Sequence, residues 1–512
     1  AIGGVINIIT NEPKDVVAFS SNSSYTRKNQ FSQGLNLDIA QGKIGSYTSY
    51  KYDHSDGWQN SRLTEDGEDI IETIAPLSLG YSSNNFSQKF TYDATDQLSF
   101  YANGGYYNRG LERPVEREDI TGGSKYNTAY EGYNWGAGAK YKLSKRNVIQ
   151  FDYSGNNYAS RYKYLIENSG YLPGQYALTK LQKFHDAELK GIFGFTTNST
   201  TVFGVDYRRE VLRRPDSDLD KSVYTASAYG QHEVKLWNHL TGVVGVRYDH
   251  HEQTGGRFTP KVAAMYNIGN FNVRATYAAG FRAPGIDELY YHMFKKTMGT
   301  RATISLGDEN LDPEHSNYYS INMEYRTNRF SASVTGYLNY VKNMVTSKST
   351  KFDDLPEAEQ NQLREEFPEI GDLSSTKNLS VKNYFNFEKA TVKGFEVNLN
   401  GNLFPGFTLT GNYTYAYGRG LNEGGEWQNI ERSIRHTATI TGNYTHSWSD
   451  YTLNLNLNGR LQSKVYYPGD ADGNAPGYGI WNLNTRHTFD GFRNFVIEPG
   501  IGIDNIFNKK DN

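Results

Sequence analysis

The chain has 512 residues with 37% in the hydrophobic set and a formal net charge of −3, and its mean hydropathy is −0.69. Its 41 Tyr, 26 Phe and 6 Trp exclude a disordered chain, because disordered segments are poor in aromatic residues. The near-neutral charge, without a block of basic residues, excludes a nucleic-acid partner, and the absence of Cys excludes thiolate metal sites, disulfides and cysteine nucleophiles.

The first fifteen residues read as a strand followed by a short connection. AIGGVINIIT at 1–10 is apolar and β-branched, and NEPKD at 11–15 is polar. No initiator Met and no signal-peptide pattern begins the chain. We expect residues 1–15 to be a strand and linker, and residues 16–512 to form the main domain.

The main domain alternates apolar and polar residues. The pattern is clear in GLNLDIA at 34–40, FEVNLNGNL at 395–403 and TLNLNLNGR at 452–460. A period of two predicts strands that have one face against an apolar medium and the other against a polar medium. No stretch has the roughly 18 consecutive apolar residues that a membrane-spanning helix needs.

The breaks between these strands alternate between short and long, with about ten of each. The short ones are hairpin-sized and rich in Gly, Asn, Asp and Ser, as at 41–45 and 268–270. The long ones include 54–85, 280–315 and 346–380. Short turns at one end and long loops at the other are typical of an outer-membrane β-barrel.

The sequence therefore predicts an all-β fold, an antiparallel transmembrane β-barrel. We place about 21 strands in the chain. Because single-chain bacterial barrels have even strand numbers, we expect 22 strands in the parent protein, with the last one missing here and the barrel incomplete at its C-terminal end.

Several stretches resemble TonB-dependent outer-membrane receptors, in the order that this family has them. GGVINIIT (3–10) resembles the end of the family's plug domain, and YAAGFRAPGIDELYY (277–291) resembles the Arg-Ala-Pro stretch that opens a long loop. GDENLDPEHS (307–316), VKGFEVNLN (392–400) and IGIDNIFNKKD (501–511) resemble later motifs. The resemblance implies that residues 1–15 are the last plug strand and its linker, and that the rest of the plug is missing.

The resemblance also implies a function, energised import of a scarce, bulky nutrient across the outer membrane of Gram-negative bacteria. Extracellular loops would bind the ligand, and the TonB complex would act through the missing plug. The implied cargo is haem, an iron-siderophore or cobalamin, with haem favoured by the motif interval discussed next. No covalent chemistry is required, so we expect no enzyme and no obligatory cofactor.

The stretch FRAPGIDELYYHMFKKTMG at 281–299 holds the predicted ligand-binding residues. Tyr290, Tyr291, His292 and Met293 could grip a flat, metal-bearing ligand, and haem receptors of the family carry a His in this interval. His292 is therefore our candidate metal ligand, for haem iron. The alternative is that the two tyrosines cap a strand and that His292 is simply solvated.

Arg282 is the fifth candidate in the site. It could pair with an anionic ligand or with a plug carboxylate. The alternative, which we favour, is that Arg282 anchors the base of the loop.

Two acidic loops are weak candidates for calcium, at 54–85 and 468–477. Oxygen ligands suit this ion, but the second loop lacks the Gly and Glu positions of a helix-loop-helix site. Solvated loops are the simpler interpretation of both.

The segment 353–369 departs from the strand pattern and predicts a short helix inside a long loop. Asp353 and Asp354 can cap it, Pro356 fits its first turn, and Leu363 and Phe367 share one face. The helix could serve as a lid or a contact for a surface partner, or merely decorate the surface.

Two other functions remain open from the sequence, a passive porin and a ligand-binding or adhesive outer-membrane barrel. A porin would need no plug-ending stretch, and the loops of the second kind of barrel would bind a partner rather than a nutrient. The sequence also leaves open which nutrient is carried and whether a surface lipoprotein caps the barrel.

Overall fold

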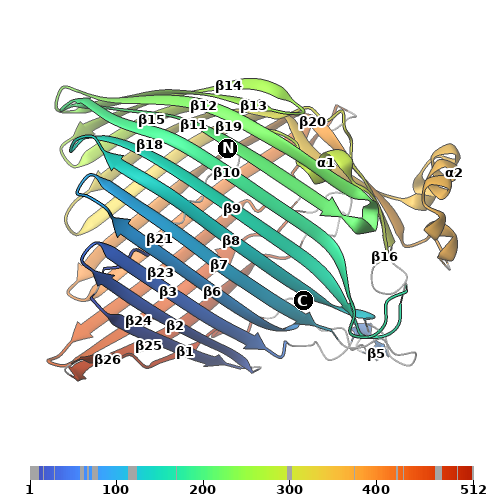
Figure 1. The fold of residues 1–512 in the computed structure, drawn as a ribbon, viewed down its shortest axis with the longest axis horizontal. Coiled ribbons are helices and arrows are strands. Elements are labelled where there is room, and N and C mark those ends of the chain that lie inside the picture. The colour runs from blue at the N-terminus through green and yellow to red at the C-terminus, as the bar shows by residue number, and fades with distance from the viewer. Residues whose placement is uncertain are drawn as a thin grey trace.

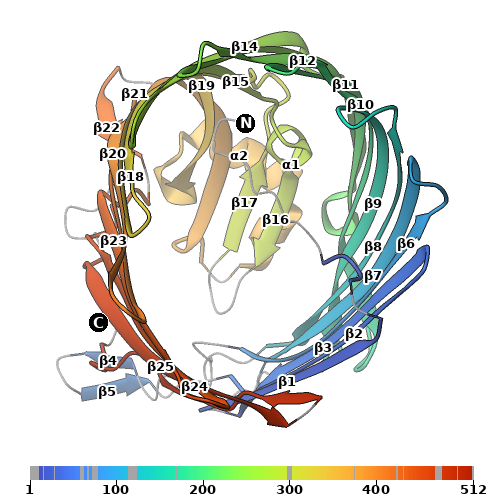
Figure 2. The ribbon, with the colours of Figure 1, turned by 90° about the vertical axis from the view of Figure 1, so that its left-hand side faces the viewer.

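The computed structural model describes the chain except residues 1–10, 15, 28, 58–62, 66–67, 72–78, 114–123, 169, 297–301, 374, 422–424, 431, 467–474, 493 and 510–512. Its dominant feature is one large sheet rolled into a barrel, seen from the side in Figure 1 and from one end in Figure 2. The predicted antiparallel β-barrel is confirmed.

The wall strands follow one another in chain order. They are β1 (Ala18–Thr26), β2 (Gln30–Gln41), β3 (Ile44–Ser55), β6 (Gly80–Asp93), β7 (Leu98–Glu112), β8 (Tyr126–Lys142), β9 (Asn147–Tyr164), β10 (Tyr176–Thr196), β11 (Ser199–Arg214), β12 (Leu219–Leu236), β13 (Leu240–His251), β14 (Gly255–Ile268), β15 (Phe271–Arg282), β18 (Glu314–Arg326), β19 (Phe330–Lys351), β20 (Leu379–Phe404), β21 (Phe407–Leu421), β23 (His436–Ser447), β24 (Tyr451–Gln462), β25 (Tyr478–Phe492), β26 (Phe495–Ile497) and β27 (Gly500–Ile503).

The remaining elements lie in the connections. They are β4 (Leu63–Glu65), β5 (Glu68–Ile71), the 3-10 helix η1 (Pro215–Ser217), α1 (Ile286–Tyr290), β16 (His292–Lys296), β17 (Ala302–Leu306), η2 (Phe352–Asp354), α2 (Glu357–Glu366), η3 (Pro368–Asp372) and β22 (Trp427–Asn429). No helix in the described part of the chain is long and apolar enough to cross a membrane.

The described wall has the expected number of strands. Twenty-five strands form the main sheet; three of them, β16, β17 and β22, belong to connections, and β26 and β27 are halves of one wall strand, which leaves 21. Within the described residues, β1 pairs only with β2, and β26 and β27 pair only with β25. The twenty-second strand and the boundary at residue 15 stay predictions.

The alternation in sequence separates an apolar outer face from a polar inner face. Along β20, the apolar Val397 and Leu399 alternate with Asn398 and Asn400. Leu399 is 44% exposed, although it is apolar. Large apolar side chains that point away from the lumen in this way suit a wall whose outer solvent is lipid.

The short hairpins at 42–43, 237–239 and 269–270 lie at one end of the barrel (Figure 1). The folded loop elements lie at the other end, where the connections at 215–218 and 252–254 are also short. The hairpin turns use left-handed residues where the backbone reverses, for example Gly42 and Gly269, with φ of 61° and 57°. Glycine adopts this conformation without strain. We call the opposite end, which carries α1, α2 and β16, the loop end.

At the loop end, two long connections fold together into one small unit, which we call the loop subdomain. It consists of β16, β17, η2, α2, η3 and the loop-end parts of β19 and β20. β17 pairs in parallel with β20, with Ile304 opposite Val381, and both side chains are fully buried. The core also contains Phe352, Leu363 and Phe367, so α2 packs on one face of this sheet.

The predicted helix at 353–369 is thus confirmed as α2, including the shared burial of Leu363 and Phe367. Its predicted capping is wrong. Pro356 occupies the N-cap position without a side-chain cap, and Asp353 and Asp354 lie in η2.

Candidate functional site

The loop that follows β15 is fixed at its base by three charged residues. Arg282, the last residue of β15, lies 2.9 Å from Oε2 of Glu288 and 2.7 Å from Oε1 of Glu314. Glu288 also accepts a hydrogen bond from the Gly285 backbone N–H, and Glu314 accepts one from Val345. These contacts are those of a loop anchor, and a ligand-binding role for Arg282 stays a prediction.

The anchored loop turns into the barrel mouth, where α1 covers part of the inner wall. Ile286 is buried against Leu212 of β11 and against Leu219 and Val223 of β12. The side chains of these wall residues face the lumen. Each lies an even number of residues along its strand from Asp206 on β11 or from Ser227 on β12, a pair of polar residues on the inner face. Apolar residues on an otherwise polar inner face thus seat the helix and set the position of the two tyrosines at its end.

Tyr290 and Tyr291 each meet a cation from the wall. Arg214 Nη1 donates a 2.9 Å hydrogen bond to the Tyr291 hydroxyl and lies 5.2 Å from its ring centroid. Lys221 Nζ lies 4.7 Å from the Tyr290 ring. Burial raises the pKa of both tyrosines, and Arg214 opposes this for Tyr291. Both hydroxyls therefore stay neutral at physiological pH and can donate hydrogen bonds.

A third pair comes from the loop subdomain. Lys382 Nζ lies 4.7 Å from the Tyr384 ring and 3.1 Å from its hydroxyl oxygen. Tyr384 packs on the same small apolar cluster as Tyr290, around Leu289. We refer to Arg214, Lys221, Tyr290, Tyr291, Lys382 and Tyr384 as the mouth cluster.

His292 and Met293 do not join the mouth cluster. The His292 ring stacks on Phe367, with centroids 4.5 Å apart, and its Nε2 lies 3.4 Å from Glu366. Met293 is buried, and its side chain leaves the opposite face of β16, since successive residues of a strand point to opposite faces. The five predicted residues are thus close in sequence but divided among an anchor, the mouth and the loop subdomain.

Across the part of the chain that the structure describes, no group of three or more His, Asp or Glu side chains is arranged to hold a metal. Residues 468–474 of the calcium prediction for 468–477 lie outside the described residues, as do the side chains of 58–78. Of the first loop, Asp53 pairs with Lys51 and Asp56 with His54. A role for His292 as a metal ligand stays untested.

More tyrosines gather on the inner rim beside β7, β8 and β9. Tyr126 stacks on Tyr162 with ring centroids 3.7 Å apart, and Arg113 lies 5.9 Å from the Tyr126 ring. Lys295 of β16 is within electrostatic range of Tyr126. The loop end thus has a second aromatic surface next to a cation.

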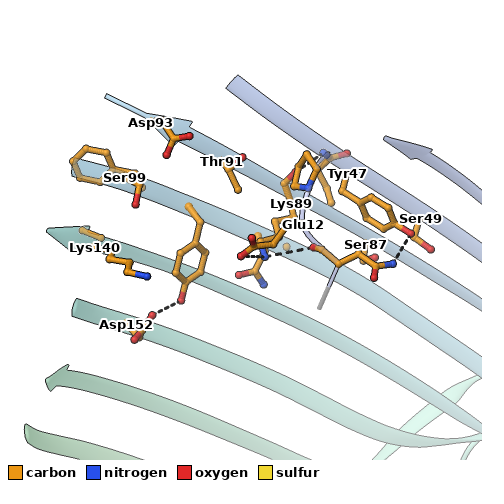
Figure 3. A pocket seen from close by; sticks show the side chains of 18 of the residues that line it. Glu12, Tyr47, Ser49, Ser87, Lys89, Thr91, Asp93, Ser99, Lys140 and Asp152 are labelled. Atoms are coloured by element: carbon orange, nitrogen blue, oxygen red, sulfur yellow. Dashed lines mark hydrogen bonds and ion pairs between the residues drawn. The ribbon is translucent and has the colours of Figure 1, made fainter. Parts of the chain in front are cut away.

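Deeper in the barrel the wall is polar and charged, and an open recess of about 1060 Å³ lies near the hairpin end. Figure 3 shows Lys89 beside Glu12, and the Tyr101 hydroxyl donates a 2.8 Å hydrogen bond to Asp152. Residues 11–14 run along this wall, where Asn11 donates to the Tyr47 hydroxyl and the Lys14 backbone N–H donates to Asp38. The interior is therefore suited to water or to a polar filling.

Sequence reasoning missed Arg214, Lys221, Lys382 and Tyr384. Their partners lie up to 77 residues away, and strand periodicity carries no such information. One signal was present: Arg214 and Lys221 flank the short connection at 215–218, and both occupy positions on the polar inner face. A search for cations at such positions would have found both.

A sequence model described as "TonB dependent receptor-like, beta-barrel" matches residues 10–506. The chain belongs to the TonB-dependent receptor family. This assignment confirms the resemblance and makes the chain an outer-membrane protein.

Relatives of this receptor barrel have known names. It is 23% identical to the "Ferric enterobactin receptor PirA" of Pseudomonas aeruginosa, over 100% of this chain and 73% of that protein. It is 22% identical to the "Vitamin B12 transporter BtuB" of Vibrio cholerae, over 68% of this chain and 53% of that protein. These relatives are receptors and transporters.

Solved structures show the same fold. The ferric enterobactin receptor PfeA of Pseudomonas aeruginosa matches with a TM-score of 0.72 at 16% identity, over 99% of this chain and 77% of that one. The FrpB iron transporter of Neisseria meningitidis has a TM-score of 0.72 at 12% identity, over 97% and 77%. At such identities the likeness concerns the fold.

The receptor barrel is shorter than its relatives. It spans 60% of the "Probable TonB-dependent siderophore receptor PirA" of Acinetobacter baumannii. The preference for haem that we drew from the sequence finds no support among these relatives, whose names refer to siderophores, iron or vitamin B12.

Proposed function

We propose that this chain is the wall of a TonB-dependent receptor that imports a ferric siderophore, and that the mouth cluster contacts the ligand. The observation that carries the proposal is the pairing of three cations with three tyrosines at the loop end. Cations attract an anionic iron chelate, and tyrosine rings and hydroxyls suit aryl groups with oxygen ligands.

Two further considerations support a siderophore with anionic aryl groups. Relatives include receptors named for enterobactin, and Arg is a strong partner for planar oxygen anions. Import itself would be driven by the TonB complex acting through a plug, as the family implies. A passive porin or an adhesive barrel has no equivalent reason to place these pairs at the mouth.

Cobalamin is the second candidate. Its support is the relationship to a vitamin B12 transporter, at 22% identity over 53% of that protein. A corrinoid has less need for three cations, so the mouth cluster favours the siderophore.

Binding to the purified chain in detergent tests the proposal. We expect ferric enterobactin to quench the intrinsic fluorescence, with cyanocobalamin and haemin binding at least ten-fold more weakly. Arg214→Ala should weaken binding of ferric enterobactin about ten-fold, which is about 1.4 kcal/mol. Arg326→Ala, a matched loss of charge at the hairpin end, should leave it unchanged.

Equal binding of all three probes, or tighter binding of cyanocobalamin, would contradict the proposal. So would an unchanged affinity in Arg214→Ala. Uptake of radiolabelled iron by cells that express the receptor gives a second readout, which does not depend on the fluorescence of Tyr291.

A further inference from the structure

The outer face of the wall at the loop end differs from the apolar band below it. On β20, the exposed apolar residues Phe395 and Leu399 place the odd-numbered side chains on the lipid-facing side. The register carries this face across neighbouring strands, with Phe395 opposite Gly336 of β19 and Tyr415 of β21. Side chains in step with these residues, farther toward the loop end, therefore also point outward.

Four of these outward residues are cations, Lys342, Lys389, Lys393 and Arg419. Together with Arg435, which lies one residue before β23 and reaches the Tyr417 ring, they form what we call the outer-rim patch. Lys342 lies directly opposite Lys389, and Lys393 lies opposite Tyr417. Lys393 and Arg435 are 5.9 and 4.9 Å from the Tyr417 ring. The patch thus surrounds a tyrosine, a residue enriched at the membrane interface.

The height of the patch matches the outer surface of a bilayer. Phe330, at the hairpin end of β19, and Lys342 are twelve residues apart, about 40 Å along the strand. At a strand tilt of about 40° this is roughly 30 Å along the membrane normal, close to the thickness of the hydrocarbon core. Lys342 therefore lies at headgroup level when Phe330 lies at the opposite interface.

Two other outward cations at the loop end are neutralised by carboxylates of the same chain. Arg161 lies 2.6 Å from Glu131, and Arg213 lies 3.7 Å from Asp220. In the outer-rim patch, Lys342, Lys393 and Arg435 have no carboxylate within ion-pair distance among the residues that the structure describes. The charges of these three side chains are thus left for a group outside the chain.

An apolar recess of about 650 Å³ lies on the wall beside the patch. Its lining includes Ala264, Ala275, Ile321, Gly336 and Leu338. Leu338 is four residues below Lys342 on β19, about 13 Å along the strand. Small side chains open a depression in the lipid-facing surface, within reach of a chain that descends from the level of the cations.

We propose that the outer-rim patch and this recess together bind a phosphate-bearing lipid of the outer leaflet, with its phosphate among Lys342, Lys393 and Arg435 and an acyl chain in the recess. Charge complementarity selects the headgroup, because lysine and arginine stems extend along apolar surface while their cations reach headgroup level. The apolar lining favours a hydrocarbon chain, because an unfilled depression would leave the lining atoms without van der Waals partners. The inference concerns the outer face and is independent of the imported ligand.

Native mass spectrometry of the chain released from detergent tests the site. Diphosphoryl lipid A and phosphatidylcholine are the lipid probes, and inorganic phosphate is the free-anion probe. We expect the chain to retain diphosphoryl lipid A at least ten-fold more strongly than phosphatidylcholine. The combined Lys342→Ala, Lys393→Ala and Arg435→Ala variant should lose this preference, at about five-fold per cation removed.

Lys163→Ala is the matched control. Lys163 also lies at the loop end of a strand, 5.8 Å from a tyrosine ring, on the distant β9. It should retain lipid as the unmodified chain does. The heat-dependent shift in gel mobility of a folded barrel shows whether each variant folds. If the triple variant does not fold, the single Lys393→Gln variant replaces it.

A second variant separates the recess from the cations. A Cβ at Gly336 would have no atom within 4 Å, so Gly336→Leu can fill the depression without a backbone clash. We expect it to weaken lipid retention several-fold while leaving the outer-rim patch intact. The proposal would be overturned if the triple variant retained diphosphoryl lipid A undiminished, or if the chain retained phosphatidylcholine equally well. It would also be overturned if inorganic phosphate alone saturated the site, or if a second protein copy were bound in place of lipid.

Discussion

Arg282 and Glu314 lie at the ends of neighbouring wall strands and directly opposite each other in the ladder, with 2.7 Å between Nη2 and Oε1. Glu314 is 7% exposed at its side chain, so the carboxylate depends on this partner. Together with Glu288 the pair closes the base of the loop that carries Tyr290 and Tyr291.

Arg282→Ala should therefore loosen this loop without unfolding the wall. Removing one member of a buried ion pair costs about 3 kcal/mol, and the buried Glu314 would be left without its cation. We expect hydrogen exchange of residues 285–291 to accelerate about a hundred-fold.

The control is Arg326→Ala. Arg326 pairs with Glu324 at 3.0 Å but its side chain is 70% exposed, and exposed pairs contribute about 1 kcal/mol or less. Similar exchange in both variants would show that the anchor does not hold the loop.

Tyr291→Phe removes the acceptor for Arg214 while keeping the ring. We expect a cost of about 1 kcal/mol in local stability, and a weaker affinity for ferric enterobactin because Arg214 loses its position. Tyr25→Phe, on the exposed outer side of β1, should change neither quantity. Isothermal titration calorimetry distinguishes the outcomes; an unaltered affinity would remove Tyr291 from the binding surface.

Ile304→Ala should destabilise the loop subdomain alone. The side chain is fully buried between β17, β20 and α2, so truncation costs about 3 kcal/mol. We expect a protease to cleave residues 357–372 much faster, while the barrel keeps its heat-dependent gel mobility. Thr303→Ala, on the opposite face of β17, is the control and should cleave at the ordinary rate.

The C-terminal end of α2 should respond to acid through Glu366. Hydrogen bonds from Gln362 and His292 lower the pKa of Glu366 below its ordinary value of 4.5. A carboxyl with a lowered pKa stabilises the fold above that ordinary value, and the contribution is lost as the pH falls through the lowered pKa.

Proteolysis of α2 should therefore accelerate below about pH 4.5 more in the unmodified chain than in Glu366→Gln. The difference between the two proteins removes the effect of other carboxyls. Parallel pH profiles would mean that Glu366 adds nothing to the docking of α2 against His292.

Much of the wall could be predicted from the sequence, since alternation is a local property. In a strand such as β24, Leu455 and Leu457 lie between asparagines. Such a short stretch is enough to predict that one face meets an apolar medium and the other a polar one. The helix α2 is also predictable from the sequence. Pro356 and Pro368 mark its two ends, and Leu363 and Phe367 repeat at helical spacing.

The loop subdomain and the mouth cluster were not predictable in this way. β16 and β17 have five residues each, and β17 finds its partner in β20, with Ala302 opposite Leu379. Such pairing depends on contacts between distant segments. For the same reason, the sequence does not predict that His292, adjacent to Tyr291, packs on Phe367 of the loop subdomain; its role as a metal ligand stays a prediction.

The parallel ladder between β17 and β20 also limits how this receptor can be re-engineered. Residues 302–306 and 379–383 belong to different surface loops, yet share one set of backbone hydrogen bonds. A chimera that takes either loop alone from a relative would break that ladder and expose Ile304 and Val381 to water. The loop subdomain of this barrel would have to be transplanted as a two-segment graft, and natural recombination within one of the loops faces the same obstacle.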